Sequence, residues 1–581
     1  MTNKYSSVNL ISNLKKSIKN LPIKIRSKIY LLIFFNLIAN IFEVIGILLI
    51  LPITALFLGL GNNNYKEYFI YLQDNFTIFN NQSSLIILSL FFFLVFFIKY
   101  FFSLFNQIYQ YSLIKNVKNY ITGVLIKTAY QKNWKKWISE NKSNLYQNVI
   151  QSADLFCYQF LLQFFLLTSE IIFFLIILII FLINFPIQTL IISLIISLLI
   201  FSYYKFIVKI FMYKLGKTRW ISDNKRIKYL NEIVGSMKDI IMFNKQNLFY
   251  NKFSKHEDQL NNANKSLAIF SQLPRLILEF SVILLFIIIL ISSSKLLDDT
   301  KISYFPYLAT FIVLLIRVLP SVNKIISAIQ QMRFCQKSVS KLNNAIKIKD
   351  IFIKDNDNLK KIKFLNELKL KNISFRYDNK YKKIFSKFNL VVKKNTFIGV
   401  EGDNGTGKST LVDIIAGLLI PMKGNIFCDG KSIKSDNLKK IVAVISQRPL
   451  LIDDTILNNI LLGAKLDKKK LKEVINLSDL KSLIKLSSNG INSKIGDSGG
   501  LISSGQMQRL AIARALYADK EILIFDEATN AIDENSEKKI ISSLLKLKKS
   551  KTIIIVSHNK KNFLNCDKIY RIKNYKLQKV K

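Results

Sequence analysis

The sequence predicts a chain of two parts: a membrane α-helical domain of six transmembrane helices, followed by an α/β domain. Up to about residue 335, long apolar runs of Ile, Leu and Phe dominate the 581-residue chain. The remainder has the mixed composition of a soluble domain. In this second part, a glycine-rich segment stands between a short apolar run and a helical pattern, which is typical of a strand-turn-helix unit in an α/β fold.

Six segments are apolar and long enough to cross a bilayer, which takes about 20 residues in a helix. We place the spans near residues 29–60, 84–112, 155–183, 187–210, 268–294 and 304–332. A run of basic residues precedes the first span, which is too long for the apolar core of a signal peptide, so we expect no cleavage there. The predicted boundaries are 1–340 for the membrane domain, 341–365 for a linker and 366–581 for the α/β domain.

Basic residues predict the orientation of these spans by the positive-inside rule. The N-terminal segment, residues 113–154 and residues 211–265 are rich in Lys and Arg, so we place them in the cytoplasm. Both termini are then cytoplasmic. The outer segment 61–83 is predicted to be either a short interfacial helix or a plain loop. The two long inner connections keep helical apolar spacing, so they are predicted to continue the membrane helices and to end in short crossing helices near residues 131–137 and 222–229.

The formal net charge of +46 invites a nucleic-acid interpretation. We reject it because Lys is spread through both halves of the chain, in a composition also enriched in Asn, Ile, Phe and Tyr, as an AT-rich coding sequence would produce. The four cysteines are far apart and form no C-x-x-C pair. With only two histidines in addition, the sequence favours neither a disulfide framework nor a zinc site.

Residues 402–410 follow an apolar run at 397–400 and precede the apolar residues 411–415. Their pattern, G-x-x-x-x-G-K-S, is typical of a phosphate-binding P-loop, in which backbone N–H groups and a helix N-terminus surround phosphate oxygens. We predict that Lys408 reaches the β- and γ-phosphates and that Ser409 ligates Mg²⁺. The predicted cofactors are ATP and Mg²⁺, and the predicted loop residues are Gly402, Asp403, Asn404, Gly405, Thr406, Gly407, Lys408, Ser409 and Thr410.

Three more strands downstream end in candidate site residues. The buried strand 522–525 runs into Asp526 and Glu527. Asp526 is predicted to hold Mg²⁺, and Glu527 to orient and polarise the attacking water. Gln447 follows the predicted strand 441–445, and His558 follows the strand 552–556.

Together these segments resemble the ATP-binding-cassette (ABC) superfamily, and the resemblance to its exporters covers nearly the whole chain. It implies that Tyr377 stacks on adenine, that Gln447 senses Mg²⁺ and the membrane domain, and that His558 contacts the γ-phosphate as a second catalytic residue. Residues 502–506 match the signature sequence, which caps the ATP of the opposite subunit. The residues predicted to do so are Ser503, Gly505 and Gln506. Here Ser504 replaces the usual first glycine and Ile502 the usual leucine, and we expect function to be retained.

A site that needs a P-loop from one subunit and a signature from another cannot be completed by one nucleotide domain. The resemblance therefore implies a dimer, most simply a homodimer, in the bacterial cytoplasmic (inner) membrane. Residues 43–52 and 316–325 look like the first and sixth spans of bacterial flippases for lipid-linked oligosaccharides. Arg317 has no opposite charge on its own helix, so it must find Glu43, Glu170 or a ligand anion. Arg317 and Glu43 are the candidate substrate residues.

Three functions remain open at this stage. The first is an ATP-driven flippase or exporter for a polyprenyl-pyrophosphate saccharide or a related glycolipid. The second is an exporter of lipid A, drugs or peptides that uses the same ATPase. The third is a membrane-anchored ATPase that regulates another process without moving a substrate.

Overall fold

The computed structural model describes residues 10–49, 53, 81–140, 142–184, 202–293, 301–346, 363–378, 383–447, 449–496, 499–528, 534–558 and 560–580. The chain divides into two compact units. The membrane unit comprises residues 1–131 and 141–351, and the nucleotide unit comprises residues 132–140 and 352–581. The segment 132–140 thus packs with the nucleotide unit, although it connects two helices of the membrane unit.

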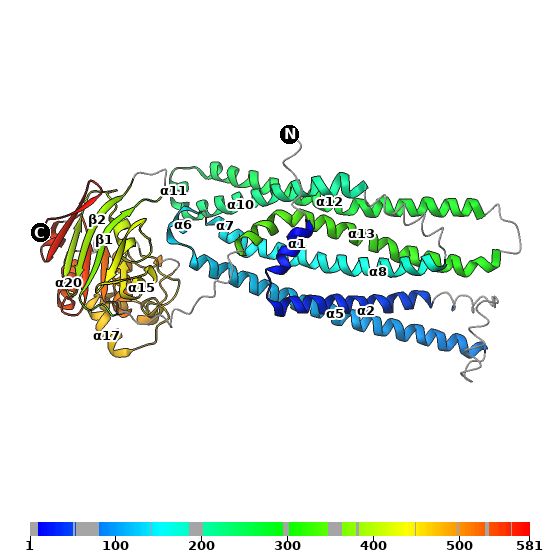
Figure 1. Ribbon diagram of the computed structural model, residues 1–581, viewed down its shortest axis with the longest axis horizontal. Helices are drawn as coiled ribbons and strands as arrows, with labels where there is room; N and C mark the ends of the chain where they lie inside the picture. Colours follow the sequence, from blue (N-terminus) through cyan, green and yellow to red (C-terminus); the bar gives the residue numbers. More distant parts are fainter. Residues whose placement is uncertain are drawn as a thin grey trace. The chain divides into compact units, whose positions relative to one another are not determined.

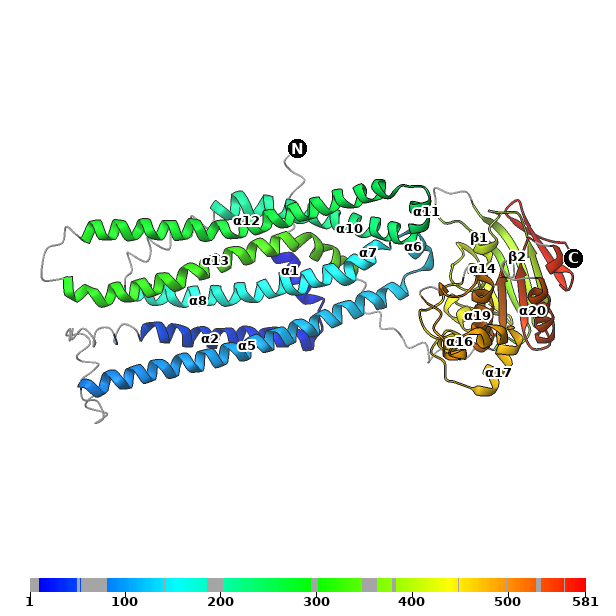
Figure 2. The ribbon, with the colours of Figure 1, turned by 180° about the vertical axis from the view of Figure 1, so that it is seen from behind.

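Long helices make up the membrane unit (Figure 1). Helix α2 lies along α5, and α8 lies along α13, as the view from behind also shows (Figure 2). In the described part of this unit, three stretches, η1 to η3, are wound as π-helices. The bounds are α1 (Leu10–Lys19), α2 (Ile23–Leu48), α5 (Asn81–Gln131), α7 (Ser143–Tyr146), η1 (Gln147–Ser152), η2 (Leu155–Leu161), α8 (Leu162–Asn184), η3 (Tyr204–Met212), α10 (Tyr213–Gly235), α11 (Met237–Met242), α12 (Gln246–Ser293) and α13 (Lys301–Ile346).

Within the described part of the chain, three helical stretches are long and apolar enough to cross a bilayer: Ile23–Leu48, Ser89–Gln131 and Ser143–Ile179. They overlap the first three predicted spans. The predicted span 187–210 lies largely outside the described residues, as does most of the outer segment 61–83. Helices α12 and α13 run through the last two predicted spans.

The inner connections continue the membrane helices, as predicted, since α5 extends for 51 residues. The short helix α6 (Trp134–Ser139) lies where the first crossing helix was expected. The expectation of a second one near 222–229 is wrong, because those residues lie inside α10. The chain turns instead at Ser236 (φ −123°, ψ 22°), after which α11 follows. Gly235 and Ser236 are poor helix formers, so the helix breaks at this pair.

Polar side chains inside the membrane unit pair with polar side chains or backbone groups of neighbouring helices. Asn106 of α5 donates to Asn36 of α2, and both side chains are buried. Asn40 of α2 donates to the carbonyl oxygen of Ser169 in α8, 2.8 Å away. Such pairs matter because a polar group buried in an apolar environment without a hydrogen bond destabilises the fold.

A proline in α12 joins three helices through one carbonyl. Pro274 has no N–H, so the carbonyl of Phe270, four residues earlier, lacks its usual helical partner. Tyr203, just before η3, donates its hydroxyl to this oxygen at 2.7 Å. Gln330 of α13 donates Nε2 to the same oxygen at 2.9 Å and to the Tyr203 hydroxyl at 2.6 Å. The freed carbonyl therefore becomes a hydrogen-bonded junction between these segments.

The described strands of the nucleotide unit form two sheets, which can be followed in Figure 2. The larger sheet has the order β10-β9-β3-β8-β7-β6, with parallel pairing from β9 to β6. Its strands are β3 (Phe397–Glu401), β6 (Val442–Ile445), β7 (Ile522–Asp526), β8 (Thr552–Val556), β9 (Lys568–Lys573) and β10 (Lys576–Lys579). The smaller, antiparallel sheet consists of β1 (Glu367–Phe375), β2 (Phe385–Lys393), β4 (Lys423–Cys428) and β5 (Lys431–Ser432).

Helices complete the unit and cover apolar strands. The buried residues of β7 and β8 pack with residues of α19 and α20 in one core, and α16 to α19 share a second core. The helices are α14 (Lys408–Ile415), α15 (Ser435–Ile441), α16 (Ile456–Leu461), α17 (Lys468–Leu477), α18 (Lys481–Leu486), α19 (Ser504–Tyr517) and α20 (Glu534–Leu547). A membrane helical region and an α/β nucleotide domain are thus both present, and the predicted fold class is confirmed.

The start of the nucleotide unit is fixed by Asp429. Its carboxylate accepts hydrogen bonds from the N–H groups of Leu365, Asn366 and Glu367, at 2.7, 2.7 and 2.8 Å. Burial alone would raise the pKa of Asp429, but these donors outweigh it and lower the pKa below its usual value. The carboxylate therefore stabilises the fold in its charged form.

We expect Asp429→Asn to lower the stability of the nucleotide unit by about 1 kcal/mol at pH 7, since charge and one acceptor are lost. Asparagine tolerates the positive φ of 48° found at this position, so the substitution should not strain the backbone. Because the folded-state pKa is depressed, the contribution is present above the ordinary pKa of 3.8 and disappears as the pH falls through the folded value. Thermal unfolding of both proteins across this range measures it. Equal melting temperatures at pH 7 would contradict the assignment.

Candidate nucleotide site

Four parallel strands bring the predicted site residues to one edge of the larger sheet. The P-loop follows β3, Gln447 follows β6, Asp526 and Glu527 stand at the end of β7, and His558 follows β8. Since the carboxyl ends of parallel strands meet at the same edge, residues more than 150 positions apart in the chain become neighbours. This edge is where α/β sheets bind their ligands.

The P-loop has the backbone that its glycines predict. Gly407 has φ +104° and directly precedes α14. A Cβ at Gly407 would lie 2.5 Å from Cγ2 of Ile384, and one at Gly402 would lie 2.8 Å from Oγ1 of Thr406. Only glycine fits both positions without displacing a neighbour. The loop therefore brings its backbone close to α14, whose free N–H groups favour an anion.

Lys408 is the first residue of α14, and only 7 % of it is exposed. Its ammonium group donates to the carbonyl oxygen of Gly402 at 2.7 Å and lies 3.5 Å from Oε1 of Glu527. A buried ammonium group needs such partners. Lys408 thus provides a fixed positive charge beside the loop, as the sequence predicts for a phosphate-binding lysine.

Glu527 lies at the centre of the predicted catalytic residues. Its carboxylate accepts a hydrogen bond from Nε2 of Gln447 at 3.2 Å and lies 3.7 Å from Nδ1 of His558. Its own N–H donates to the carbonyl oxygen of Val556 in β8 at 2.9 Å, with φ +51°, an uncommon value for a residue other than glycine. The sheet therefore holds the backbone of Glu527 in a strained conformation that places its side chain among Lys408, Gln447 and His558.

Asp526 and Ser409 form the part of the site that fits Mg²⁺. The Ser409 hydroxyl and the Asp526 carboxylate share a hydrogen bond. Burial raises the pKa of Asp526 and the negative charge of Glu527 adds to it, while Ser409 and Lys408 oppose the rise. A hydroxyl and a carboxylate that converge are the hard oxygen ligands that Mg²⁺ takes together with phosphate oxygens. When bound, Mg²⁺ would neutralise phosphate charge.

Tyr377 lies close to the P-loop helix. It follows β1, its ring makes an edge-on contact with Phe375 at 5.2 Å between centroids, and its hydroxyl lies 3.3 Å from Oγ1 of Thr410. The adenine-stacking role of Tyr377 stays a prediction, but the structure places this residue beside the loop that would hold the phosphates.

Residues 385–530 match the family model described as "ABC transporter". Residues 385–530 are therefore similar to the domain that ABC transporters share. An "ATP-dependent lipid A-core flippase" of Wigglesworthia glossinidia brevipalpis is 30 % identical over 378 residues, which cover 62 % of this chain and 64 % of that protein. The "Multidrug resistance-like ATP-binding protein MdlB" of Buchnera aphidicola subsp. Acyrthosiphon pisum is 36 % identical over 214 residues, covering 36 % and 37 % of the two chains. This chain therefore spans between about one third and two thirds of these relatives.

A solved structure of a bacterial Atm1-family ABC exporter with ATP bound resembles the chain with a TM-score of 0.77. The sequence identity is 16 %, and 95 % of both chains is covered, so this likeness concerns the fold. The predicted resemblance to ABC exporters is confirmed, and residues 385–530 form the ATPase domain of the family.

The predicted signature residues form the start of α19. Ser503 is the N-cap residue, and its hydroxyl accepts a hydrogen bond from the N–H of Gln506, while the Gln506 side chain accepts one from the N–H of Ser503. This capping box follows from the S-x-x-Q spacing and was available in the sequence. Among the described residues, no hydrogen bond or ion pair joins Ser503 or Gln506 to the P-loop. Their action on the ATP of a second subunit stays a prediction.

Two contacts of the cassette domain were not predicted from the sequence. Nε2 of Gln508 in α19 donates to the carbonyl oxygen of Gln447 at 3.1 Å, which links the signature helix to the catalytic edge. The carboxylate of Asp413 in α14 accepts a hydrogen bond from the indole of Trp134 in α6. Burial raises the pKa of Asp413 to about 6, and the charge of Asp526 acts in the same direction. No local sequence pattern predicts either contact.

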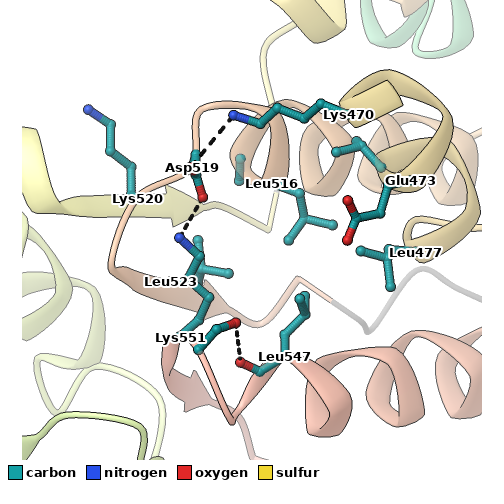
Figure 3. A pocket seen from close by; sticks show the side chains of 12 residues that line it. Lys470, Glu473, Leu477, Leu516, Asp519, Lys520, Leu523, Leu547 and Lys551 are labelled. Atoms are coloured by element: carbon teal, nitrogen blue, oxygen red, sulfur yellow. Dashed lines mark hydrogen bonds and ion pairs between the residues drawn. The ribbon is translucent and has the colours of Figure 1, made fainter. Parts of the chain in front are cut away.

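A separate cavity of about 160 Å³ lies away from the catalytic edge, between α17, the end of α19 and the end of α20 (Figure 3). Apolar side chains form part of its lining, and Asp519 lies between Lys551, at 2.6 Å, and Lys470, at 3.7 Å. None of the lining residues belongs to the P-loop or to the strand ends that hold Gln447, Glu527 and His558. The cavity therefore does not overlap the predicted nucleotide site.

We expect Glu527→Gln to bind ATP at least as well as the unchanged protein but to hydrolyse it about 10²–10⁴ times more slowly. The amide keeps the shape of the side chain but cannot polarise water, and Lys408 and Asp526 are unchanged. Phosphate release measures hydrolysis, and an equilibrium titration with a fluorescent ATP analogue measures binding. Turnover close to that of the unchanged protein would contradict the role of Glu527.

Proposed function

We propose that this chain hydrolyses ATP and uses the energy to move a glycolipid, such as a lipid-linked oligosaccharide, from the inner to the outer leaflet of the bacterial cytoplasmic membrane. The main support for the proposal is the length of the segment that matches the lipid A-core flippase. Its 378 matched residues exceed the length of the nucleotide unit, so the similarity extends into the membrane unit. That relative is described as a lipid A-core flippase.

In the proposed hydrolysis, a water molecule donates a hydrogen bond to Glu527 and its oxygen attacks the γ-phosphorus of ATP. The water proton passes to the carboxylate of Glu527 and from there to the released phosphate. The bond from that phosphorus to the bridging oxygen of ADP breaks as the new bond forms. Lys408 supplies positive charge to the phosphate oxygens, and Ser409 with Asp526 would hold the metal ion. Gln447 and His558, both close to Glu527, would orient the water and the γ-phosphate.

A drug exporter is the second candidate, and the similarity to MdlB favours it. That match of 214 residues is no longer than the nucleotide unit itself. It therefore supports the shared ATPase and carries less information about the transported molecule.

The substrate is proposed to meet positive charge in the membrane, and Arg317 is the candidate. Arg317 belongs to α13, but its side chain lies outside the described residues. Glu43 lies 3.3 Å from Lys99, and Glu170 lies 2.8 Å from Lys324, so both candidate partners of Arg317 contact a lysine. The ion pair with Lys99 favours a structural role for Glu43. Arg317 is proposed to meet a ligand anion because the arginine fork suits phosphate oxygens.

We expect the purified protein in proteoliposomes to flip a labelled polyprenyl-pyrophosphate saccharide when ATP is supplied, and Arg317→Ala to abolish flipping while basal ATP hydrolysis continues. A pyrophosphate in a low-dielectric region needs a positive partner, and the arginine fork suits phosphate oxygens better than lysine does, so Arg317→Lys should restore only part of the rate. Lys28→Ala, in the cytoplasmic part of α2, is a matched control. Normal flipping by Arg317→Ala would remove Arg317 from the substrate site.

The proposed homodimer leads to a separate expectation for mixed dimers. When one subunit carries Lys408→Ala and the other carries altered Ser503 and Gly505, one composite site keeps both an intact P-loop and an intact signature. Partial ATP hydrolysis should therefore remain. When all three changes are placed in one subunit beside an unchanged partner, neither composite site is intact, and hydrolysis should be lost. The opposite pattern would show that each subunit forms its own site.

A further inference from the structure

Helices α10 and α13 of the membrane unit approach each other closely at a glycine. A Cβ at Gly216 would lie 1.8 Å from the carbonyl oxygen of Phe334, so a larger residue would not fit there. The next turn of α10 carries Trp220, and the next turns of α13 carry Lys337 and Lys341. The close packing of the two helices therefore brings these three side chains together, beyond the end of the last predicted span.

The indole of Trp220 lies beneath two ammonium groups. Nζ of Lys341 lies 5.4 Å from the ring centroid of Trp220, and Nζ of Lys337 lies 6.0 Å from it. The face of an indole attracts positive charge at such distances. The backbone of Trp220 is fixed as well, since its carbonyl oxygen accepts a hydrogen bond from Nε2 of Gln147 at 2.9 Å. Trp220 therefore holds two cations close to each other.

Positive charge accumulates around this indole. Burial lowers the pKa of Lys337, and the positive charges of Lys341 and Lys217 lower it further. In the described part of the chain, neither Lys337 nor Lys341 takes part in an ion pair. Asp223, the nearest carboxylate along α10, is itself bound by Arg226 at 3.0 Å. Because like charges repel at close range, a bound anion would relieve an unfavourable interaction that the fold otherwise keeps.

The same indole also carries a hydrogen-bond donor. Its N–H is buried, and among the described residues it has no acceptor. A buried donor without a partner is costly, so this N–H favours a ligand that brings an acceptor. The three ammonium groups are donors too. A phosphate monoester or a pyrophosphate offers several acceptor oxygens and more than one negative charge, whereas a carboxylate brings a single charge. The donors and charges therefore fit phosphate best.

We propose that Lys217, Trp220, Lys337 and Lys341 form a binding site for a phosphate group. The ammonium groups contact its oxygens, and the indole N–H supplies one more hydrogen bond. All four residues belong to the membrane unit, so this site is distinct from the nucleotide site and adds to the proposed function. Two sources share the required chemistry: the head group of a lipid such as phosphatidic acid, and a soluble phosphate such as pyrophosphate.

The fluorescence of Trp220 can report on this site directly. The chain has three tryptophans, and the other two, Trp134 and Trp137, are replaced by Phe in the full-length protein. One sample, in an uncharged detergent, is titrated with sodium pyrophosphate. A second is placed in phosphatidylcholine nanodiscs with increasing fractions of phosphatidic acid. We expect a saturable fluorescence change in at least one series, which identifies the soluble or the lipid source. No change in either series would overturn the proposal.

Charge variants separate the site from a general effect of positive charge. Lys337→Gln combined with Lys341→Gln should weaken binding at least roughly tenfold, the size of one hydrogen bond to a charged group. Lys252→Gln combined with Lys255→Gln, on α12, is the matched control. It removes the same charge, and Lys252 also lies near an aromatic ring, 5.3 Å from the centroid of Phe249. Equal losses in the two double variants would contradict the site.

Two further measurements exclude other causes of a changed response. Lys408→Ala alters the P-loop, so a Trp220 response that disappears in this variant would place the anion in the P-loop and overturn the proposal. A response that persists supports the site whether or not the protein hydrolyses ATP or moves a lipid. Thermal unfolding without ligand shows whether the charge variants fold, and Lys341→Gln alone, at an exposed position, carries the test if the double variant does not.

Discussion

The parallel pairing of β3, β8, β7 and β6 is the constraint on which the nucleotide site depends. It aligns the carboxyl ends of four strands, so the P-loop, Gln447, Glu527 and His558 meet without any direct link between them in the chain. The hydrogen bond from the N–H of Glu527 to Val556 extends this pairing by one residue beyond β7. The backbone of the sheet therefore sets the position of Glu527, and the contacts of its carboxylate act on a residue whose backbone is already in place.

The membrane unit obeys a different constraint, since its interior offers few partners for polar groups. Helices α2, α5, α8 and α13 carry Asn, Ser, Glu and Lys side chains that pair across helix boundaries. Close approach depends on small residues as well, since a Cβ at Gly216 in α10 would lie only 1.8 Å from the carbonyl oxygen of Phe334 in α13. The polar pairs and the close approach at glycine fix which helix faces meet. If one helix rotated about its axis, the polar pairs would separate, or side chains would clash with the backbone of the neighbouring helix.

The parts of the molecule that local patterns encode could be predicted from the sequence. The P-loop was predictable because its glycines, its lysine and its flanking strand and helix are adjacent in the chain. The ion pair between Arg275 and Glu279, at 2.7 Å, was predictable from a spacing of four residues on one helix. The second crossing helix was misplaced because apolar spacing shows that a segment is helical and does not show where the helix breaks. The contacts of Lys99 with Glu43 and of Trp134 with Asp413 join distant segments, so only the folded chain reveals them.

The hydrogen bonds at the Phe270 carbonyl make substitutions at Pro274, Tyr203 and Gln330 depend on one another. Replacing Pro274 would restore an N–H that competes for the Phe270 carbonyl, and the hydroxyl of Tyr203 and the amide of Gln330 would then be left to find other partners inside the membrane unit. Replacing Tyr203 or Gln330 by an apolar residue would in turn deprive the carbonyl of a donor as long as the proline remains. Substitution at any one of them is therefore costly alone and tolerable only together with the others, so the three should be exchanged as a set or kept as a set.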